Sequence, residues 1–268
     1  MDAKTISLLY FSPTKTTREI VQAIGKGSGL QILQDIDLTA PQVRESVIEL
    51  KADIVIIGIP VYAFTIPSTV YPCLNQLEGK GKPVILVTVY GNMSAGHALT
   101  NLASLCTARH FMVTGGGIFI GRHSFSSPQA PLASDRPDKK DLQIAEKFGK
   151  DIVHKLVQPG PILPLTFADS KYSKKAMTNP THLARIVAGP SKFDPTLCTG
   201  CLSCVRNCPA GAIDKKTMQT NAATCIRCYA CVTTCPTKAR TVSLRFRPVL
   251  HAVFYMKNKA HPMPQLYL

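Results

Sequence analysis

Short apolar runs alternate with longer helix-like segments over the first 157 residues of the chain. At least the first, third and fourth runs are apolar on both faces, as expected for strands of a parallel sheet that helices cover on both sides. The predicted strands are residues 6–11, 30–36, 54–59, 84–90 and 111–120, and the predicted helices are residues 17–26, 41–50, 68–77, 97–108 and 137–157. The strict alternation predicts a doubly wound α/β domain with a parallel sheet of five strands over residues 1–158.

The sequence changes character after residue 158. Residues 159–192 contain five prolines and a basic stretch with Lys171, Lys174 and Lys175. This composition predicts a connection between domains, either a solvated linker or a docking segment, with a short helix near residues 182–187. Residues 248–268 form a tail that mixes apolar and basic residues. Its first half is expected either to pack as an amphipathic helix or to present a surface to a partner or a membrane.

A cysteine repeat occupies residues 193–247. Each half has the spacing C-x2-C-x2-C-x3-C-P, and the second half follows the first after 27 residues. Three thiolates spaced in this way can hold three corners of an iron–sulfur cube, and the fourth ligates the other cube. We therefore predict two [4Fe-4S] clusters in a small α+β domain. The expected ligand sets are Cys198, Cys201, Cys204 with Cys235, and Cys225, Cys228, Cys231 with Cys208.

Structural zinc and disulfide bonds are the alternatives for these cysteines. Zinc sites favour pairs of ligands separated by a longer spacer, rather than three cysteines crowded together and a fourth before proline. Disulfides belong to exported chains, and the N-terminus shows no signal peptide. The two remaining cysteines, Cys73 and Cys106, lie far apart and are expected to be buried, inert thiols.

A loop rich in hydroxyl groups follows the first predicted strand and leads directly into a helix. In an open α/β sheet, ligands bind beyond the carboxyl ends of the strands, and a helix N-terminus offers free N–H groups to a phosphate. Helix capping by serine or threonine is the simpler explanation, but it accounts for only one or two of the four hydroxyls. The loop residues are Ser12, Pro13, Thr14, Lys15, Thr16 and Thr17.

Two family resemblances follow from these motifs. Residues 193–244 resemble the bacterial two-cluster ferredoxin domain, and the hydroxyl-rich loop resembles the phosphate loop of flavodoxins. Two further loops look like those that surround the flavin ring in flavodoxins, and the resemblance implies FMN as the second cofactor. The FMN contacts that it implies are Ser12, Thr14, Lys15, Thr16, Thr17, Pro60, Val61, Tyr62, Ala63, Phe64, Tyr90, Gly91 and Asn92. Taken singly, Tyr62, Phe64 and Tyr90 could equally be packing residues. Arg122 and His123 follow the fifth strand, where a flavin contact and loop packing both remain open.

Together the matches resemble flavodoxin–ferredoxin fusion proteins, an electron-transfer family of anaerobic prokaryotes. The resemblance implies a protein that passes low-potential electrons between FMN and two clusters and exchanges them with a partner enzyme. One alternative is an FMN-dependent reductase that acts directly on a small molecule and receives its electrons through the clusters. A redox-responsive binding protein is the other alternative.

Positive charge is concentrated in the C-terminal part of the chain. Residues 1–158 carry 16 Lys and Arg against 13 Asp and Glu, whereas residues 159–268 carry 15 against 3. This imbalance predicts a redox partner with an acidic docking surface, while nucleic acid remains a weaker possibility because basic charge alone is a poor signal. No apolar stretch reaches the roughly 20 residues that cross a bilayer. A soluble cytoplasmic protein is the expectation, and peripheral membrane contact stays open.

Overall fold

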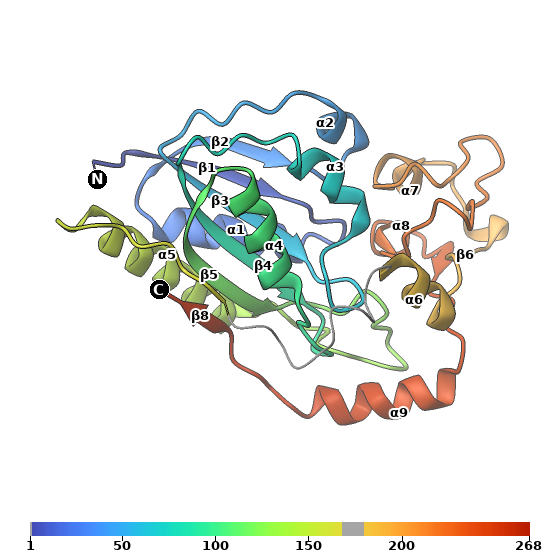
Figure 1. The fold of residues 1–268 in the computed structure, drawn as a ribbon. Helices are drawn as coiled ribbons and strands as arrows, with labels where there is room; N and C mark the ends of the chain where they lie inside the picture. The colour runs from blue at the N-terminus through green and yellow to red at the C-terminus, as the bar shows by residue number, and fades with distance from the viewer. Residues whose placement is uncertain (1, 168–179) are drawn as a thin grey trace.

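The structure is a computed structural model that describes residues 2–167 and 180–268 (Figure 1). Lys171, Lys174 and Lys175, the predicted basic stretch, lie outside the described residues. The short helix predicted near residues 182–187 is present as α6 (Pro180–Val187). Among the described residues, no helix has the length and apolar character that crossing a membrane requires.

One sheet organises the N-terminal part of the chain. Its strands are β1 (Thr5–Tyr10), β2 (Gln31–Asp37), β3 (Ile54–Pro60), β4 (Pro83–Tyr90), β5 (Met112–Ile120) and β8 (Gln265–Tyr267). They lie in the order β2-β1-β3-β4-β5-β8, and every pair except the last is parallel. The order 2-1-3-4-5 is that of flavodoxin-like doubly wound folds. The predicted parallel sheet of five strands is confirmed.

Helices cover both faces of this sheet. The helices α1 (Thr16–Gly27) and α5 (Lys139–Val157) pack on one face, and α3 (Tyr71–Leu74) and α4 (Ala98–Ala108) pack on the other. Every residue of β3 is buried, because this central strand contacts a hydrophobic core on each side. The cysteines Cys73 and Cys106 are buried thiols in one of these cores, as expected.

Two of the five predicted helices are shorter than expected. α2 (Pro41–Glu45) ends at Ser46, which has an extended backbone, and it buries none of its residues. A helix without a packed face gains too little to propagate further. Residues 68–77 form a 3₁₀ turn, η1 (Ser68–Val70), followed by the single turn of α3.

The sixth strand was not predicted. β8 comes from the C-terminal tail and pairs antiparallel with β5, at the free edge of the parallel sheet. A strand of only three exposed residues has no periodicity that the sequence could reveal. Its pairing covers the N–H and C=O groups of an edge that would otherwise be open to other chains.

The cysteine repeat folds with little regular structure. The strands β6 (Lys192–Phe193) and β7 (Arg240–Thr241) pair with each other, and η3 (Pro195–Leu197) precedes the first motif. The single-turn helices α7 (Ser203–Arg206) and α8 (Ala230–Thr233) occupy equivalent places in the two halves. Each is preceded by a residue in the left-handed region, Leu202 or Tyr229, so the internal repeat is also a repeat of backbone conformation.

The tail ties the two parts of the chain together. From the cysteine repeat it forms α9 (Arg247–Asn258) and then runs back to the sheet as β8 (Figure 1). Phe254 of α9 is buried against Ala130 and Leu132, which follow β5. Asn92, beyond the end of β4, donates from Nδ2 to the carbonyls of Lys257 at 2.8 Å and Ala260 at 3.1 Å.

Asn92 provides a test of this attachment. It has a φ of 61°, which alanine tolerates poorly and glycine tolerates well. We expect Asn92→Ala to lower the free energy of unfolding by about 2–3 kcal/mol, from two lost hydrogen bonds and the backbone cost. Asn92→Gly should lose less, because only the hydrogen bonds disappear. Chemical denaturation measures both variants, and an unchanged Asn92→Ala would show that these bonds do not stabilise the protein.

Candidate cofactor sites

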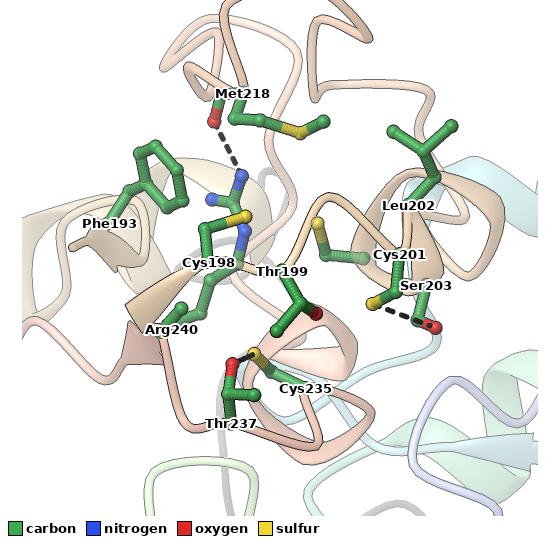
Figure 2. Close-up of a pocket in the computed structure, with 12 residues that line it drawn as sticks. Phe193, Cys198, Thr199, Cys201, Leu202, Ser203, Met218, Cys235, Thr237 and Arg240 are labelled. Atoms are coloured by element: carbon green, nitrogen blue, oxygen red, sulfur yellow. Dashed lines mark hydrogen bonds between the residues drawn. The ribbon is translucent and has the colours of Figure 1, made fainter. Parts of the chain in front are cut away.

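Four cysteines from both halves of the repeat line one cavity. They are Cys198, Cys201 and Cys204 from the first motif and Cys235, the last cysteine of the second motif. Figure 2 shows the labelled sulfurs of Cys198, Cys201 and Cys235 around this cavity. All of the residues that line the cavity belong to the segment 193–240. This grouping matches the first ligand set expected from the spacing.

Local backbone geometry brings the first three sulfurs together. Gly200 has a φ of 68° and Leu202 a φ of 59°, so the chain turns sharply on either side of Cys201. The N–H of Gly200 donates to the sulfur of Cys198 at 3.5 Å. The Ser203 side chain lies 3.5 Å from the sulfur of Cys201, and this hydrogen bond lowers the pKa of Cys201. A lower pKa favours the thiolate, which is the form that binds metals.

The remaining four cysteines interact with one another electrostatically. Burial raises the pKa of Cys228 well above its usual value, and the neighbouring Cys231, Cys208 and Cys225 raise it further. Burial likewise raises the pKa of Cys231 to about 11, with contributions from Cys225 and Cys208. Since such interactions require proximity, the structure groups three cysteines of the second motif with the last cysteine of the first motif. This is the second expected set.

Among the described residues, no three His, Cys, Asp or Glu side chains converge on the position of a single metal ion. A four-iron cluster does not require such convergence. Each of its four thiolates binds a different iron, so the sulfurs surround a volume instead of a point. The cavity that the first set lines has this arrangement.

A second cavity, of about 330 Å³, lies at the carboxyl ends of β3, β4 and β5. Its volume is in the range of small-molecule sites. Several of the predicted FMN contacts line this cavity together. They are Thr14, Thr16, Pro60, Val61, Tyr62, Ala63, Phe64, Tyr90 and Gly91. The three loops that the sequence singled out therefore face one space.

Four of the predicted contacts do not line this cavity. Ser12 uses its hydroxyl to accept from the N–H of Arg18 at 3.0 Å, and Thr17 is buried beside Gly58. Asn92 binds the tail, as described above. Lys15 lines a neighbouring cavity of about 310 Å³ that lies between the hydroxyl-rich loop and the cysteine repeat. Its walls also include Thr14, so the two cavities meet at this residue.

The hydroxyl-rich loop has the properties that a phosphate group requires. In the first turn of α1, the N–H of Arg18 donates to Ser12 and that of Glu19 to Lys15. Among the described residues, the N–H groups of Thr16 and Thr17 have no acceptor. Free N–H groups at a helix N-terminus, next to the hydroxyls of Thr14 and Thr16, fit an anion.

The other end of the cavity is aromatic, and its phenols and its imidazole are uncharged. Burial raises the pKa of Tyr62 and Tyr90, so both phenols stay protonated. Burial lowers the pKa of His123 to about 4, so its imidazole is neutral at neutral pH. The Nδ1 atom of His123 accepts from the N–H of Phe125 at 3.0 Å, which leaves the proton on Nε2. Flat apolar rings around a cavity suit an isoalloxazine ring.

The close packing at Gly91 explains why this position lacks a side chain. A Cβ atom there would lie 2.6 Å from the ring of His123. His123 in turn contacts Phe125 and Phe254 through its ring, so the loops after β4 and β5 and the helix α9 meet at this point. Arg122 and His123, whose place beyond the fifth strand the sequence left open, both line this cavity.

Sequence reasoning missed part of the wall. Ile226 and Arg227, which stand between Cys225 and Cys228, line the same cavity, as do Leu250 and Phe254 of α9. The side chain of Cys228 also interacts electrostatically with Tyr62. No sequence pattern in the cysteine repeat or in α9 predicts these contacts, because they depend on how the cysteine repeat packs over the sheet.

Comparison with known proteins agrees with the cysteine pattern. Residues 191–236 match the family described as the 4Fe-4S dicluster domain. No curated protein matches the chain.

Several solved structures are similar to the chain. One is a flavodoxin from the domain Archaea, with a TM-score of 0.41 and 17% identity over 57% of this chain and 99% of that chain. Another is a flavone reductase, with a TM-score of 0.44 and 10% identity over 61% of this chain and 66% of that one. The rubredoxin oxygen:oxidoreductase from Desulfovibrio gigas has a TM-score of 0.42 and 14% identity, over 57% of this chain and 36% of its own. The assignment of the α/β fold rests on the strand order.

The grouping of the cysteines can be tested by counting iron in double variants. We expect the reconstituted protein to hold about eight irons, and Cys208→Ser with Cys231→Ser to leave about four, because both changes affect one cluster. Cys201→Ser with Cys231→Ser should leave almost none. Cys106→Ser, a change of a buried thiol outside both sets, is the control and should keep all the iron. Equal iron contents in the two double variants would refute the crossed grouping.

Proposed function

We propose that this chain, which joins a flavodoxin-like α/β domain to a 4Fe-4S dicluster domain, is an electron-transfer protein that binds FMN and two [4Fe-4S] clusters. The observation that carries the proposal is the shared cavity: the loop between Cys225 and Cys228 forms part of the wall of the site at the carboxyl end of the sheet. A flavin in this cavity would lie next to one of the two cysteine sets.

The residues divide the binding of FMN between the two ends of the cavity. Thr14, Thr16 and the free N–H groups at the start of α1 would hold the phosphate. The loops that contain Tyr62 and Tyr90 would enclose the ring and exclude water from it. Bound FMN can exchange one or two electrons and each cluster only one, so the set of cofactors can connect electron-pair chemistry to single-electron chemistry.

The two cysteine sets stand at different distances from the cavity. The set with Cys228 adjoins it, and Cys228 is 7% exposed. The set with Cys201 has no wall residue from the α/β domain, and Cys201 is exposed. We infer that the first-motif cluster is the one from which electrons are exchanged with a partner, and that the second-motif cluster is the one that serves the flavin.

Exposed cations lie close in the sequence to cysteines of the first-motif set. Arg206 follows Cys204, Lys238 follows Cys235, and Lys192 begins the strand that precedes the first motif. Since positive surfaces attract negative ones over distances comparable to the Debye length, the partner is inferred to be a redox protein with an acidic docking surface.

The phosphate end of the site can be tested with two ligands. We expect Thr14→Val to weaken FMN binding about tenfold, because a hydrogen bond to a charged group is lost. Riboflavin, which lacks the phosphate, should bind the variant and the parent equally well. Thr14→Ser keeps the hydroxyl and is the matched control. Fluorescence titration provides the dissociation constants, and an equal loss for both flavins would place the phosphate elsewhere.

The docking proposal predicts a dependence on salt. Electron transfer from the reduced protein to an acidic redox protein should slow by about tenfold or more when ionic strength rises from roughly 0.02 M to 0.5 M. Transfer to a small neutral oxidant should change much less. Stopped-flow spectroscopy measures both rates. Rapid catalytic reduction of a small molecule, together with salt-independent protein transfer, would instead favour a stand-alone FMN reductase.

A further inference from the structure

Arg227 is a buried cation whose bonded partners are all neutral. It stands between Cys225 and Cys228 and is 6% exposed. Its Nε donates to the carbonyl of Ala188 at 3.1 Å, and its Nη1 donates to the carbonyls of Ala222 at 3.2 Å and Cys225 at 2.8 Å. None of the ion pairs between described residues includes Arg227.

The third nitrogen of this guanidinium is still available. Among the described residues, Nη2 of Arg227 has no hydrogen-bond acceptor. It is also absent from the fully buried side-chain nitrogen and oxygen atoms that lack a partner. Arg227 lines the cavity at the carboxyl end of the sheet. A hydrogen-bond donor with a permanent positive charge is therefore present in the wall of the cavity.

The cavity itself offers no charge to balance this cation. Its wall contains no aspartate or glutamate from the described residues, and Tyr62 and His123 are neutral for the reasons given above. The other cation in the wall, Arg122, is exposed at its surface and adds to the positive charge. A buried charge without a counter-charge is costly. The thiolates of the second motif lie on one side of Arg227, and on the cavity side this cation fits a negative group that enters from outside the protein chain.

We propose that Arg227 is a flavin-binding residue of the ferredoxin domain, and that it stabilises the negative charge that the FMN ring carries after reduction. The proposal rests on the proposed function. When oxidised FMN takes up two electrons and one proton, its ring gains one negative charge, and the electrons come from an external reductant. Because Arg227 also adjoins the cysteines of the second motif, one cation faces both redox sites.

A structural role for Arg227 makes a different prediction. If the guanidinium only organised the loop through the three carbonyls, its loss would weaken oxidised and reduced FMN equally. A charge that acts on the ring affects the reduced form more, since only that form carries the added charge. The ratio of the two affinities, which sets the midpoint potential of the flavin, therefore separates the two roles.

The experiment measures FMN binding under anaerobic conditions, in the fully oxidised protein and in the protein reduced with dithionite. Arg227→Gln should weaken the binding of reduced FMN about tenfold more than that of oxidised FMN, which corresponds to a two-electron potential about 30 mV lower. Arg227→Lys keeps the charge and should retain the parental ratio within about threefold. Arg245→Gln, which removes an exposed arginine from the same domain, is the matched control and should leave both affinities unchanged.

Each outcome bears on one of the two proposals. Failure of the parent protein to bind FMN at all would overturn the proposed function. Parental binding of FMN, with equal losses for both forms in Arg227→Gln, would overturn only the role of Arg227. If Arg227→Gln does not keep its iron, Arg227→Met takes its place as the uncharged variant: a parental ratio in Arg227→Met overturns the inference, and a tenfold fall in the ratio supports it.

Discussion

The arrangement of the two candidate cofactor sites depends on one contact, the packing of the second cysteine motif against the carboxyl end of the sheet. Electron transfer slows steeply with distance, so two separately folded sites are useful to each other only where they are held side by side. Here Phe125, after β5, meets Tyr229 edge to face with ring centroids 5.4 Å apart, and Tyr62, after β3, interacts with Cys228. Tyr229 is itself fixed by hydrogen bonds from its hydroxyl to Gly189 and Ser243. The cavity at the carboxyl end of the sheet therefore adjoins the second cysteine set, and residues from both parts of the chain line this cavity.

The chain maintains this contact from several directions. α6 supplies Ala184 and Val187 to the cavity wall before the first motif begins, and α9 supplies Phe254 after the second motif ends. The tail then adds β8 to the edge of the sheet, so the dicluster segment is connected to the α/β domain on both sides. Arg44 reaches across to donate to the carbonyl of Pro209, which adds a contact on the opposite side of the repeat. A single flexible linker would leave the spacing of the two sites undefined, whereas this double attachment restricts it.

The features that the sequence predicted are those that short-range patterns determine. The parallel strands could be predicted because a strand such as β3, covered by helices on both sides, must be apolar on both faces. The cysteine sets could be predicted because the spacing of the cysteines indicates which thiolates can reach one cube. The residues Thr14 and Tyr62 were found because a topological rule places the loops after the strands at one edge. Ile226, Arg227 and Phe254 could not be found in that way, because their role arises from the docking of one segment on another. β8 was missed for the same reason, since its three residues become a strand only through the edge of β5.

The difference between short-range patterns and contacts made by docking also applies to the positive charge in the C-terminal part of the chain. The count of basic residues indicated a docking surface, and exposed cations such as Lys238 are suited to that role. Arg227 and Arg240 are not, because both are buried. Arg240 donates to the hydroxyls of Ser191 and Thr220 and lies over the ring of Phe193. It lines the cavity of the first cysteine set, and its charge opposes the rise that burial causes in the pKa of Cys231 in the second set. Arg227 thus stands between the cavity at the carboxyl end of the sheet and the second set, and Arg240 stands between the two sets. Under the proposed function, a positive charge at these two places favours the reduced form of each neighbouring cofactor. We therefore propose that part of the basic character of this segment acts on redox potentials inside the protein, independently of any partner.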